Sequence, residues 1–315
     1  MKKDSEKKSW VDSSEVIHKG NVLQDAGKFT VIDCDCCGFA HIVPLPTLRE
    51  LETIYAHEYY TQEKPLYIER YLEDKDWWDS VYGKRYATLE NYLGERKGSI
   101  LDVGSGPGLF LALGRERGWT VKGIEPSIEA GNYSRDILGL NVDNVFLDMN
   151  TAPMLGQFDV VNMGEVLEHL TDPAEILKIA NSLIKKEGLI SLVVPNDFNP
   201  FQLILRDHLD FKPWWVAPPH HLNYFSHESL KKLVERSGFK VLHMESTFPI
   251  DIFLMMGKNY IGNDTLGREM HGLRKAFEKN LSDAGAVELQ RNLYGKLASL
   301  GLGREVVLYA RRLGT

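Results

Sequence analysis

The chain has 315 residues, 43% of them hydrophobic, so it can form one large domain or two modest ones around a buried core. Its net charge of −7 and its lack of a long basic run exclude a nucleic acid as an expected partner. The polar N-terminus is unlike a secretory signal, and no apolar run reaches the ~18 residues that span a bilayer. The three cysteines cluster in Cys34–Cys37, which suits a reducing compartment, and we expect a cytoplasmic protein.

The first 96 residues are predicted to form a segment of their own. Residues 28–60 carry the cysteines, the stretch PLPT and a helix-like apolar period at about 48–59, and residues 65–95 are rich in Tyr and Trp and look helical. We therefore predict a ribbon-like and helical cap over residues 1–96.

From Gly98 onward, short apolar segments alternate with helical patterns. The expected strands are SILDVG, WTVKGIE, VFLD, FDVVNM and LISLVVP, followed later by FKVLHMES and REVVLYARR. This alternation predicts an α/β domain at 97–315 with a Rossmann-like, mostly parallel sheet of seven strands flanked by helices. The last strand is expected to be antiparallel, and about fifty residues before it, at 250–300, form a helical insertion.

The stretch ILDVGSGPG places Gly104, Gly106 and Gly108 between the first strand and a helix. Glycines there let a ligand approach the backbone N–H groups at the helix start. A dinucleotide loop would need its third glycine at position 109, which is Leu109, so the register argues against a nicotinamide cofactor. Glu125, at the end of the second strand, could accept hydrogen bonds from two ribose hydroxyls. A tight turn that binds nothing is the alternative.

With these residues in view, the chain resembles the class I S-adenosylmethionine (SAM)-dependent methyltransferases. The resemblance covers about residues 30–250 and rests on the motifs ILDVGSGPG, GIEPS, FLD, FDVVNMGEVLEHLTDP and LKIANSLIKKEGLISLVVPN. It implies SAM as cofactor and S-adenosylhomocysteine as product. Position by position, it implies that Asp102 and the first glycines meet the methionine end, Glu125 holds the ribose, Asp148 lies near the adenine, and the end of the fourth strand borders the sulfonium. The cofactor-binding residues so predicted are Asp102, Gly104, Ser105, Gly106, Gly108, Glu125, Pro126, Asp148, Met163, Gly164 and Glu165.

Two further stretches, CDCCGFAHIVPLPTLRELETIYAHEYY and PPHHLNYFSHESLKKLVERSGF, resemble a bacterial subgroup associated with sugars and cell-surface glycans. This likeness implies O-methylation of a sugar or nucleotide-linked sugar, so the expected partner is a small molecule or glycan. A methyltransferase for a quinone, a small aromatic or a carbon centre is the alternative. A SAM-binding scaffold without catalysis is the third reading.

That subgroup often opens with a zinc ribbon of two C-x-x-C pairs, but this chain has only the pair Cys34 and Cys37. His41 and a distant His18 could complete four zinc ligands, although the spacing matches no standard ribbon. We predict a degenerate ribbon whose small thiols pack as hydrophobes, and no metal site, with zinc as the alternative.

A hydroxyl acceptor benefits from a base with a pKa near neutrality, which favours histidine. His220 and His221 follow the fifth strand and are predicted over the pocket, with His221 preferred because the H-x-x-Y-F spacing starts there. His169, in the LEHL block, is the competing candidate and is expected to be structural.

Tyr60, Arg85 and Trp215 are the predicted substrate contacts. The other aromatic residues before the glycine loop are expected to belong to the core. The apolar stretch at 248–264 is expected to be a buried helix, with a substrate wall or a homodimer contact as the alternative.

Overall fold

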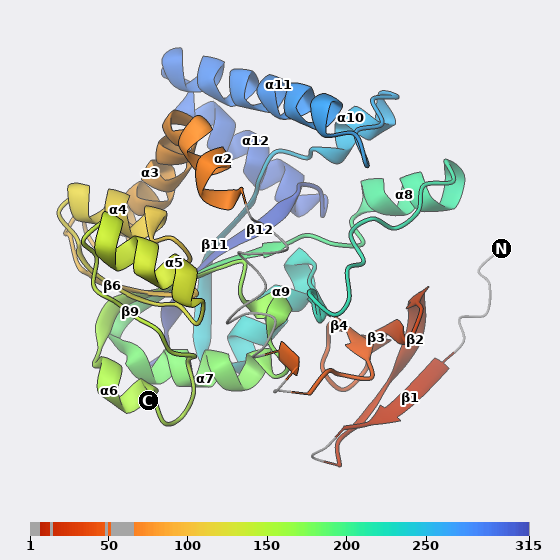
Figure 1. Cartoon of the computed structure of the whole chain (residues 1–315), viewed down its shortest axis with the longest axis horizontal. Helices are drawn as coiled ribbons and strands as arrows, with labels where there is room; N and C mark the ends of the chain where they lie inside the picture. The colour runs from red at the N-terminus through yellow and green to blue at the C-terminus, as the bar shows by residue number, and fades with distance from the viewer. Residues whose placement is uncertain (1–6, 13–14, 48–49, 52–65, 315) are drawn as a thin grey trace.

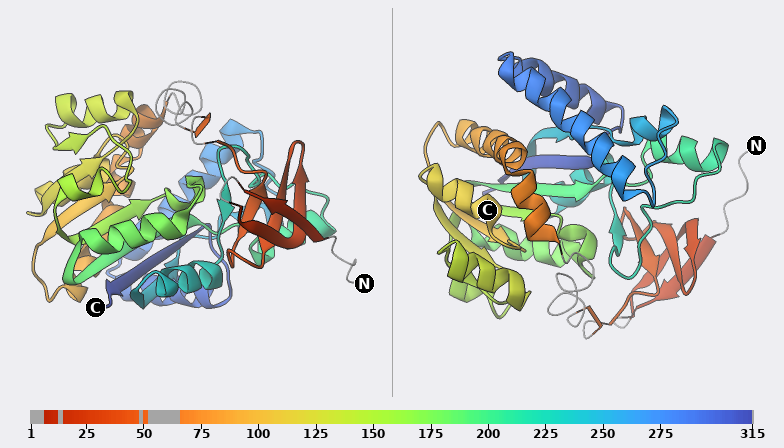
Figure 2. Two further views of the ribbon diagram at one scale, coloured as in Figure 1. Left: turned by 90° about the horizontal axis from the view of Figure 1, so that it is seen from below. Right: turned by 45° about the horizontal axis from the view of Figure 1, so that its top comes forward.

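The computed structural model describes residues 7–12, 15–47, 50–51 and 66–314, and places them in two sheets (Figure 1). A five-stranded sheet has the order β1-β2-β3-β4-β10, and a seven-stranded sheet has the order β11-β12-β9-β8-β5-β6-β7. Figure 2 shows the small sheet beside the large one, at the end of the molecule where the N-terminus lies.

The large sheet confirms the predicted Rossmann-like α/β fold. Strands β5 to β9 run parallel, while the last strand, β12, is antiparallel to both of its neighbours. In spatial order the strands are β11 (Phe239–Ser246), β12 (Glu305–Arg312), β9 (Ile184–Pro195), β8 (Phe158–Gly164), β5 (Ser99–Val103), β6 (Thr120–Ile124) and β7 (Val142–Asp143).

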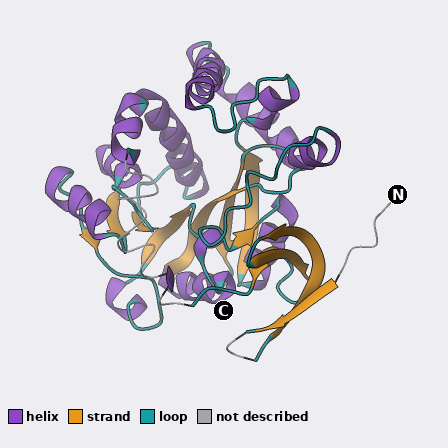
Figure 3. Cartoon of the chain, turned by 45° about the vertical axis from the view of Figure 1, so that its right-hand side comes forward, coloured by secondary structure: helices purple, strands orange, loops and turns teal. Residues whose placement is uncertain are grey.

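Helices surround this sheet (Figure 3). Those of the alternating part are α4 (Leu109–Glu116), α5 (Ile128–Asn132), α6 (Ala152–Leu155), α7 (Pro173–Leu183), α8 (Pro200–His208) and α9 (His227–Arg236), with a π-turn η2 (Tyr133–Ile137) and a 3₁₀ turn η3 (Leu167–His169). Before the sheet come α2 (Tyr67–Glu73) and α3 (Lys75–Tyr92). The predicted insertion before the last strand is helical and comprises α10 (Asp251–Met255), α11 (Asp264–Asp283) and α12 (Val287–Ser299). None of the helices described here has the length and apolarity to cross a membrane.

The third strand differs from the prediction. The predicted VFLD segment lies beyond β7, because the backbone that pairs with β6 is Val142–Asp143. Val145–Asp148 instead forms the loop that follows the strand. Val145 and Leu147 of that loop pack against the core rather than extend the ladder, while Phe146 is exposed.

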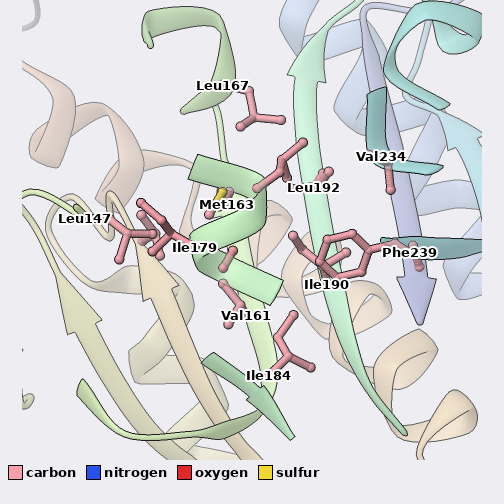
Figure 4. Packing of buried hydrophobic residues seen from close by; sticks show 14 of the residues in the cluster. Leu147, Val161, Met163, Leu167, Ile179, Ile184, Ile190, Leu192, Val234 and Phe239 are labelled. Atoms are coloured by element: carbon pink, nitrogen blue, oxygen red, sulfur yellow. The ribbon is translucent and has the colours of Figure 1, made fainter. Parts of the chain in front are cut away.

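The core covers both faces of the large sheet. Val161 and Met163 of β8 pack with α7 and α9 on one face, and Figure 4 shows Met163 beside Leu192. Val160, which alternates with them, packs on the other face with residues of α3 and α4. Burial on both faces explains why this strand is apolar throughout, as a central parallel strand must be.

The N-terminal segment contains a sheet where a ribbon-like and helical cap was predicted. Its own strands are β1 (Lys7–Val11), β2 (Ile17–Ala26), β3 (Phe29–Cys34) and β4 (Ala40–Val43). Its fifth strand, β10 (Asn223–Tyr224), comes from the end of the chain segment that follows β9. The helix predicted near residues 48–59 falls almost wholly outside the described residues, and the boundary at residue 96 stays a prediction.

The apolar stretch at the start of the insertion contains the short helix α10. Phe253 and Leu254 are buried there, while Met256 is 67% exposed just beyond it. This placement agrees with a buried helix. A homodimer contact stays a prediction.

Glu90 ties α3 to the large sheet. Its buried carboxylate accepts hydrogen bonds from Lys97, Arg117 and Trp119, at 2.7, 2.8 and 3.0 Å. Burial alone would raise the pKa of Glu90, but these three donors outweigh it and lower the pKa to about 2. A lowered carboxyl pKa stabilises the fold at pH values above the unfolded pKa, and that stability is lost as pH falls toward the folded pKa.

We therefore expect Glu90→Gln to lower the free energy of unfolding at pH 7 by roughly 2–3 kcal/mol, at about 1.4 kcal/mol per pKa unit. The difference from the wild type should shrink as pH falls from 4.5 to 2. Urea unfolding followed by circular dichroism across this range measures it. The exposed Glu116→Gln is the control, and a difference that stays constant down to pH 2 would contradict the assignment.

Candidate active site

The glycine-rich turn joins β5 to α4 at the carboxyl edge of the sheet. Gly104 has φ +69°, and a Cβ added there would lie 2.7 Å from Cγ2 of Val166. Gly108 caps α4 with φ +79°, and a Cβ there would meet Leu140 at 2.6 Å. Only glycine combines these backbone angles with such close approach. The turn is therefore shaped as the sequence predicted.

Glu125 lies at the end of β6 and fastens this turn. Its Oε2 accepts a hydrogen bond from the N–H of Gly106, and its Oε1 accepts one from the N–H of Ser127, both at 2.8 Å. Burial raises the pKa of this carboxyl to about 7, although both backbone donors oppose the shift. A buried acid that bridges two loops over a cavity is able to bind a pair of hydroxyl groups.

Asp102 occupies the end of β5 and faces Asn162 on β8. The side-chain amide of Asn162 donates to Oδ1 of Asp102 at 2.7 Å. Burial raises the pKa of Asp102 to about 7; the bond from Asn162 lowers it, and the charge of Glu125 raises it further. Two carboxyls of such pKa beside one turn mark a functional site.

A cavity of about 540 Å³ opens along this edge of the sheet. Polar residues of its wall include Ser105 and Asn162. The cavity brings together nine of the predicted cofactor residues: Asp102, Gly104, Ser105, Gly106, Glu125, Pro126, Asp148, Gly164 and Glu165.

Gly108 and Met163 are the two predicted cofactor residues that do not line it. Gly108 stands behind the turn as the cap of α4, and the side chain of Met163 is fully buried in the core. The neighbouring Glu165 does reach the wall, with φ +57°, and its N–H donates to the carbonyl of Val193 at 2.8 Å. Non-glycine residues at such angles are concentrated at functional sites.

Asp148 reaches the cavity from the loop after β7. Its Oδ1 accepts hydrogen bonds from the N–H groups of Asn150 and Thr151 at 2.8 and 2.7 Å. The backbone bond from Thr151 is the main reason why the pKa of Asp148 lies below its usual value. The carboxylate is therefore ionised and held at the rim by its own turn.

Among the three candidate histidines, His169 of η3 lines the cavity, and the described wall includes neither His220 nor His221. Nδ1 of His169 lies 2.7 Å from the carbonyl oxygen of His220, and the rings of His169 and His221 are 5.1 Å apart. A carbonyl can only accept, so we infer that Nδ1 carries the proton and that Nε2 is the basic nitrogen. The rings of His169 and His221 meet edge to face, and Oε1 of Glu168 lies 3.8 Å from Nε2 of His169.

The predicted substrate contacts separate in the structure. Arg85 lines the cavity, with its guanidinium 3.9 Å from the carboxylate of Glu305. Trp215 is buried in the core of the small sheet, with its ring against Phe198, away from the described wall. Tyr60 lies outside the described residues.

Several wall residues were not singled out from the sequence. Asn162 is the polar residue inside the apolar strand FDVVNM, which was a usable signal, whereas nothing near Glu305 marked it. Aromatic residues also line the cavity beside Asp102, namely Tyr67, Trp78, Tyr82 and Phe110. Tyr82 belongs at the same time to the core and Trp78 packs against it, as the sequence led us to expect.

The site fits SAM on these observations. The glycine turn admits a ligand close to the backbone, and Glu125 can accept from ribose hydroxyls. Asp102 can face the positively charged methionine end.

Comparison with known proteins agrees with this geometry. The chain is 33% identical over 115 residues to "Ubiquinone biosynthesis O-methyltransferase" of Pseudomonas paraeruginosa, covering 34% of this chain and 50% of that protein. It is 32% identical over 108 residues to the protein of that name from Escherichia coli O157:H7, covering 31% and 45%. The chain thus spans about half the length of these curated relatives.

Solved structures similar to the chain include a SAM-dependent methyltransferase from Archaeoglobus fulgidus, at 20% identity and a TM-score of 0.46, covering 73% of this chain and 94% of that one. Another is magnesium protoporphyrin IX methyltransferase from Synechocystis with bound SAH, at 13% identity and a TM-score of 0.45, covering 75% and 85%.

The family model described as "Methyltransferase domain" matches residues 78–244, more than half of the chain, from α3 through most of β11. That span contains the glycine turn, Glu125, Asn162 and His169. The chain therefore belongs to this methyltransferase family and is an enzyme with SAM as its cofactor.

Proposed function

We propose that this enzyme methylates a hydroxyl oxygen of a small aromatic acceptor of the quinol or catechol type. The observation that carries the proposal is the aromatic side of the cavity. Trp78 and Tyr82 lie with ring centroids 5.3 Å apart, and Tyr82 meets Phe110 edge to face at 5.4 Å. Such surfaces stack on planar rings.

The relatives named for ubiquinone biosynthesis support this acceptor over the sugar that the resemblance alone placed first. A fold does not determine which substrate an enzyme takes. The choice of an aromatic acceptor therefore rests on the residues of the cavity wall and on the sequence match to part of these relatives. The cytoplasmic location stays a prediction, as does a glycan acceptor.

When bound, SAM supplies a methyl group that its sulfonium makes electrophilic. The chain's residues then have two tasks. The turn at Gly104–Gly106, Glu125 and the aromatic wall orient the reactants, which is the larger part of catalysis for such a displacement. Nε2 of His169 takes the proton of the acceptor hydroxyl as the oxygen becomes nucleophilic.

The test is methyl transfer from labelled SAM to a catechol and, in parallel, to UDP-glucose. We expect a methyl ether of the catechol, identified by mass spectrometry, and no label in the nucleotide sugar. Trp78→Ala should raise KM for the catechol, and Trp78→Phe should restore it because the ring is kept. Transfer to the sugar alone would overturn the aromatic acceptor and restore the glycan reading.

Cofactor binding should depend on pH. The pKa values of Asp102 and Glu125 both lie at about 7, well above those of unfolded carboxyls, because both groups are buried. In the free enzyme, therefore, stability contributed by these groups falls as pH rises from about 4 to 7. Glu125 accepts from ribose hydroxyls best when ionised, and its ionised fraction rises about tenfold between pH 6 and pH 8.

We expect the affinity for S-adenosylhomocysteine to rise by about tenfold from pH 6 to pH 8, with release of protons on binding. Calorimetric titration in two buffers of different ionisation heat measures both quantities. An affinity that is constant over this range, with no proton release, would show that neither carboxyl titrates near neutrality.

A further inference from the structure

A second polar cluster lies in the small sheet, away from the cavity. It joins His18 of β2 with Cys34 at the end of β3, Cys37 in the following turn and His41 of β4, and one donor atom from each lies within 4.8 Å of all the others. Three of these residues are buried, and Cys37 is half-buried. The sequence offered these four residues as an alternative set of zinc ligands, although their spacing matches no standard ribbon.

The distances between the donor atoms suit a tetrahedral zinc ion. Nδ1 of His18 lies 3.1 Å from Nε2 of His41, 3.4 Å from Sγ of Cys37 and 3.8 Å from Sγ of Cys34. Zinc–nitrogen and zinc–sulfur bonds at a tetrahedral centre place such ligand atoms about 3.3–3.8 Å apart. The four side chains therefore need little movement to share one ion.

The outer contacts of both histidines favour metal binding. Nδ1 of His41 lies 2.8 Å from the carbonyl oxygen of Ile42, and Nε2 of His18 lies 3.4 Å from a carboxylate oxygen of Asp12. Each of these nitrogens faces an acceptor and so carries the proton. The other two nitrogens then turn lone pairs toward each other across 3.1 Å, an arrangement that a cation between them stabilises.

We propose that His18, Cys34, Cys37 and His41 bind one zinc ion. Four protein ligands close the coordination shell, so the ion is structural and takes no part in methyl transfer. The ligand set differs from a ribbon of two C-x-x-C pairs, since two histidines from β2 and β4, the strands on either side of β3, replace the second pair. The inference does not depend on which acceptor the enzyme methylates.

The proposed zinc site is connected to the histidine side of the cavity through β10. His41 pairs with Asn223 in the β4–β10 ladder, and the amide of Asn223 donates to the carbonyls of Leu167 and Leu170 at 2.9 and 2.7 Å. Those carbonyls flank His169 in η3. The ion would thereby fix the strand that holds the histidine side of the cavity.

The test is metal content of the chain purified without a polyhistidine tag, in reducing buffer. We expect about one zinc per chain for the wild type. The matched control is Cys36→Ser, because Cys36 is exposed and outside the cluster, and it should retain the metal. Cys34→Ser with His41→Ala should lower the content more than tenfold, and S-adenosylhomocysteine titration reports whether this variant is folded.

A second measurement does not depend on a variant. Cobalt(II) added to the chelator-treated wild type should give the thiolate charge-transfer band and the intense visible bands of a tetrahedral site. A wild type without zinc and without these bands would overturn the proposal. A Cys34–Cys37 disulfide in the fresh protein, or unchanged zinc in the folded double variant, would overturn it equally. These experiments measure metal content and the cobalt spectrum, not activity. A negative result would therefore overturn the zinc site without bearing on the proposed methyl transfer.

Discussion

Replacing His169 by alanine should lower kcat by about 100- to 10,000-fold, the range expected when a general base is lost. His169 lines the cavity, and its Nδ1 faces the carbonyl of His220, so we infer that Nε2 is the nitrogen that takes the acceptor proton. Binding of S-adenosylhomocysteine should remain close to that of the wild type. Steady-state kinetics with the catechol acceptor and calorimetric titration measure the two effects.

His221→Ala is the matched comparison, since its ring lies 5.1 Å from that of His169 but outside the described cavity wall. We expect a smaller loss of kcat, because His221 supports the ring that acts. The acid limb of the pH–rate profile should disappear in His169→Ala and persist in His221→Ala. A larger loss in His221→Ala, together with loss of that limb, would transfer the role of base to His221, the residue that the sequence favoured.

Replacing Glu125 by glutamine should weaken binding of S-adenosylhomocysteine by about 10- to 100-fold. Hydrogen bonds to a charged group contribute about 1.5–3 kcal/mol, and about 1.4 kcal/mol corresponds to a factor of ten in affinity. In the wild type, the carboxylate accepts hydrogen bonds from the N–H groups of Gly106 and Ser127. The NH₂ group of a glutamine would face one of these N–H groups, so two donors would meet and that hydrogen bond would be lost. Calorimetric titration at pH 8 gives the dissociation constant.

Glu129→Gln is the control, because Glu129 is exposed one turn away on α5. It should bind S-adenosylhomocysteine as the wild type does. If Glu125→Gln has wild-type affinity while its thermal unfolding is unchanged, Glu125 only braces the glycine turn and does not hold the cofactor.

Much of the cofactor site followed from local sequence. The order of apolar strand, glycine turn and helix is encoded within a few residues, and the positive φ angles of Gly104 and Gly108 bear it out. Glu125 ends the next strand, and parallel strands end at one edge, so its meeting with the turn follows from the fold. The position of Asp148 was also predicted, although the strand assigned just before it was wrong.

Other features of the site and the fold could not be predicted from local sequence patterns. Met163 and Trp215 have the residue types of a binding wall, yet the packing of the two sheets buries both in cores. The N-terminal sheet was missed because its fifth strand is the two-residue β10, contributed from far along the chain. Arg85 meets Glu305 only because β12 inserts beside β9.

By itself, then, the sequence determined the α/β fold and the cofactor, because glycine conformations, strand ends and helix caps depend on neighbours in the chain. The tertiary structure decided that His169 lines the cavity while His221 lies outside its described wall. The positions of the two histidines depend on how η3 packs against the segment that leads into β10. The tertiary structure also decided that His18 meets Cys34, Cys37 and His41, because antiparallel pairing places the start of β2, the end of β3 and the start of β4 at one end of the small sheet.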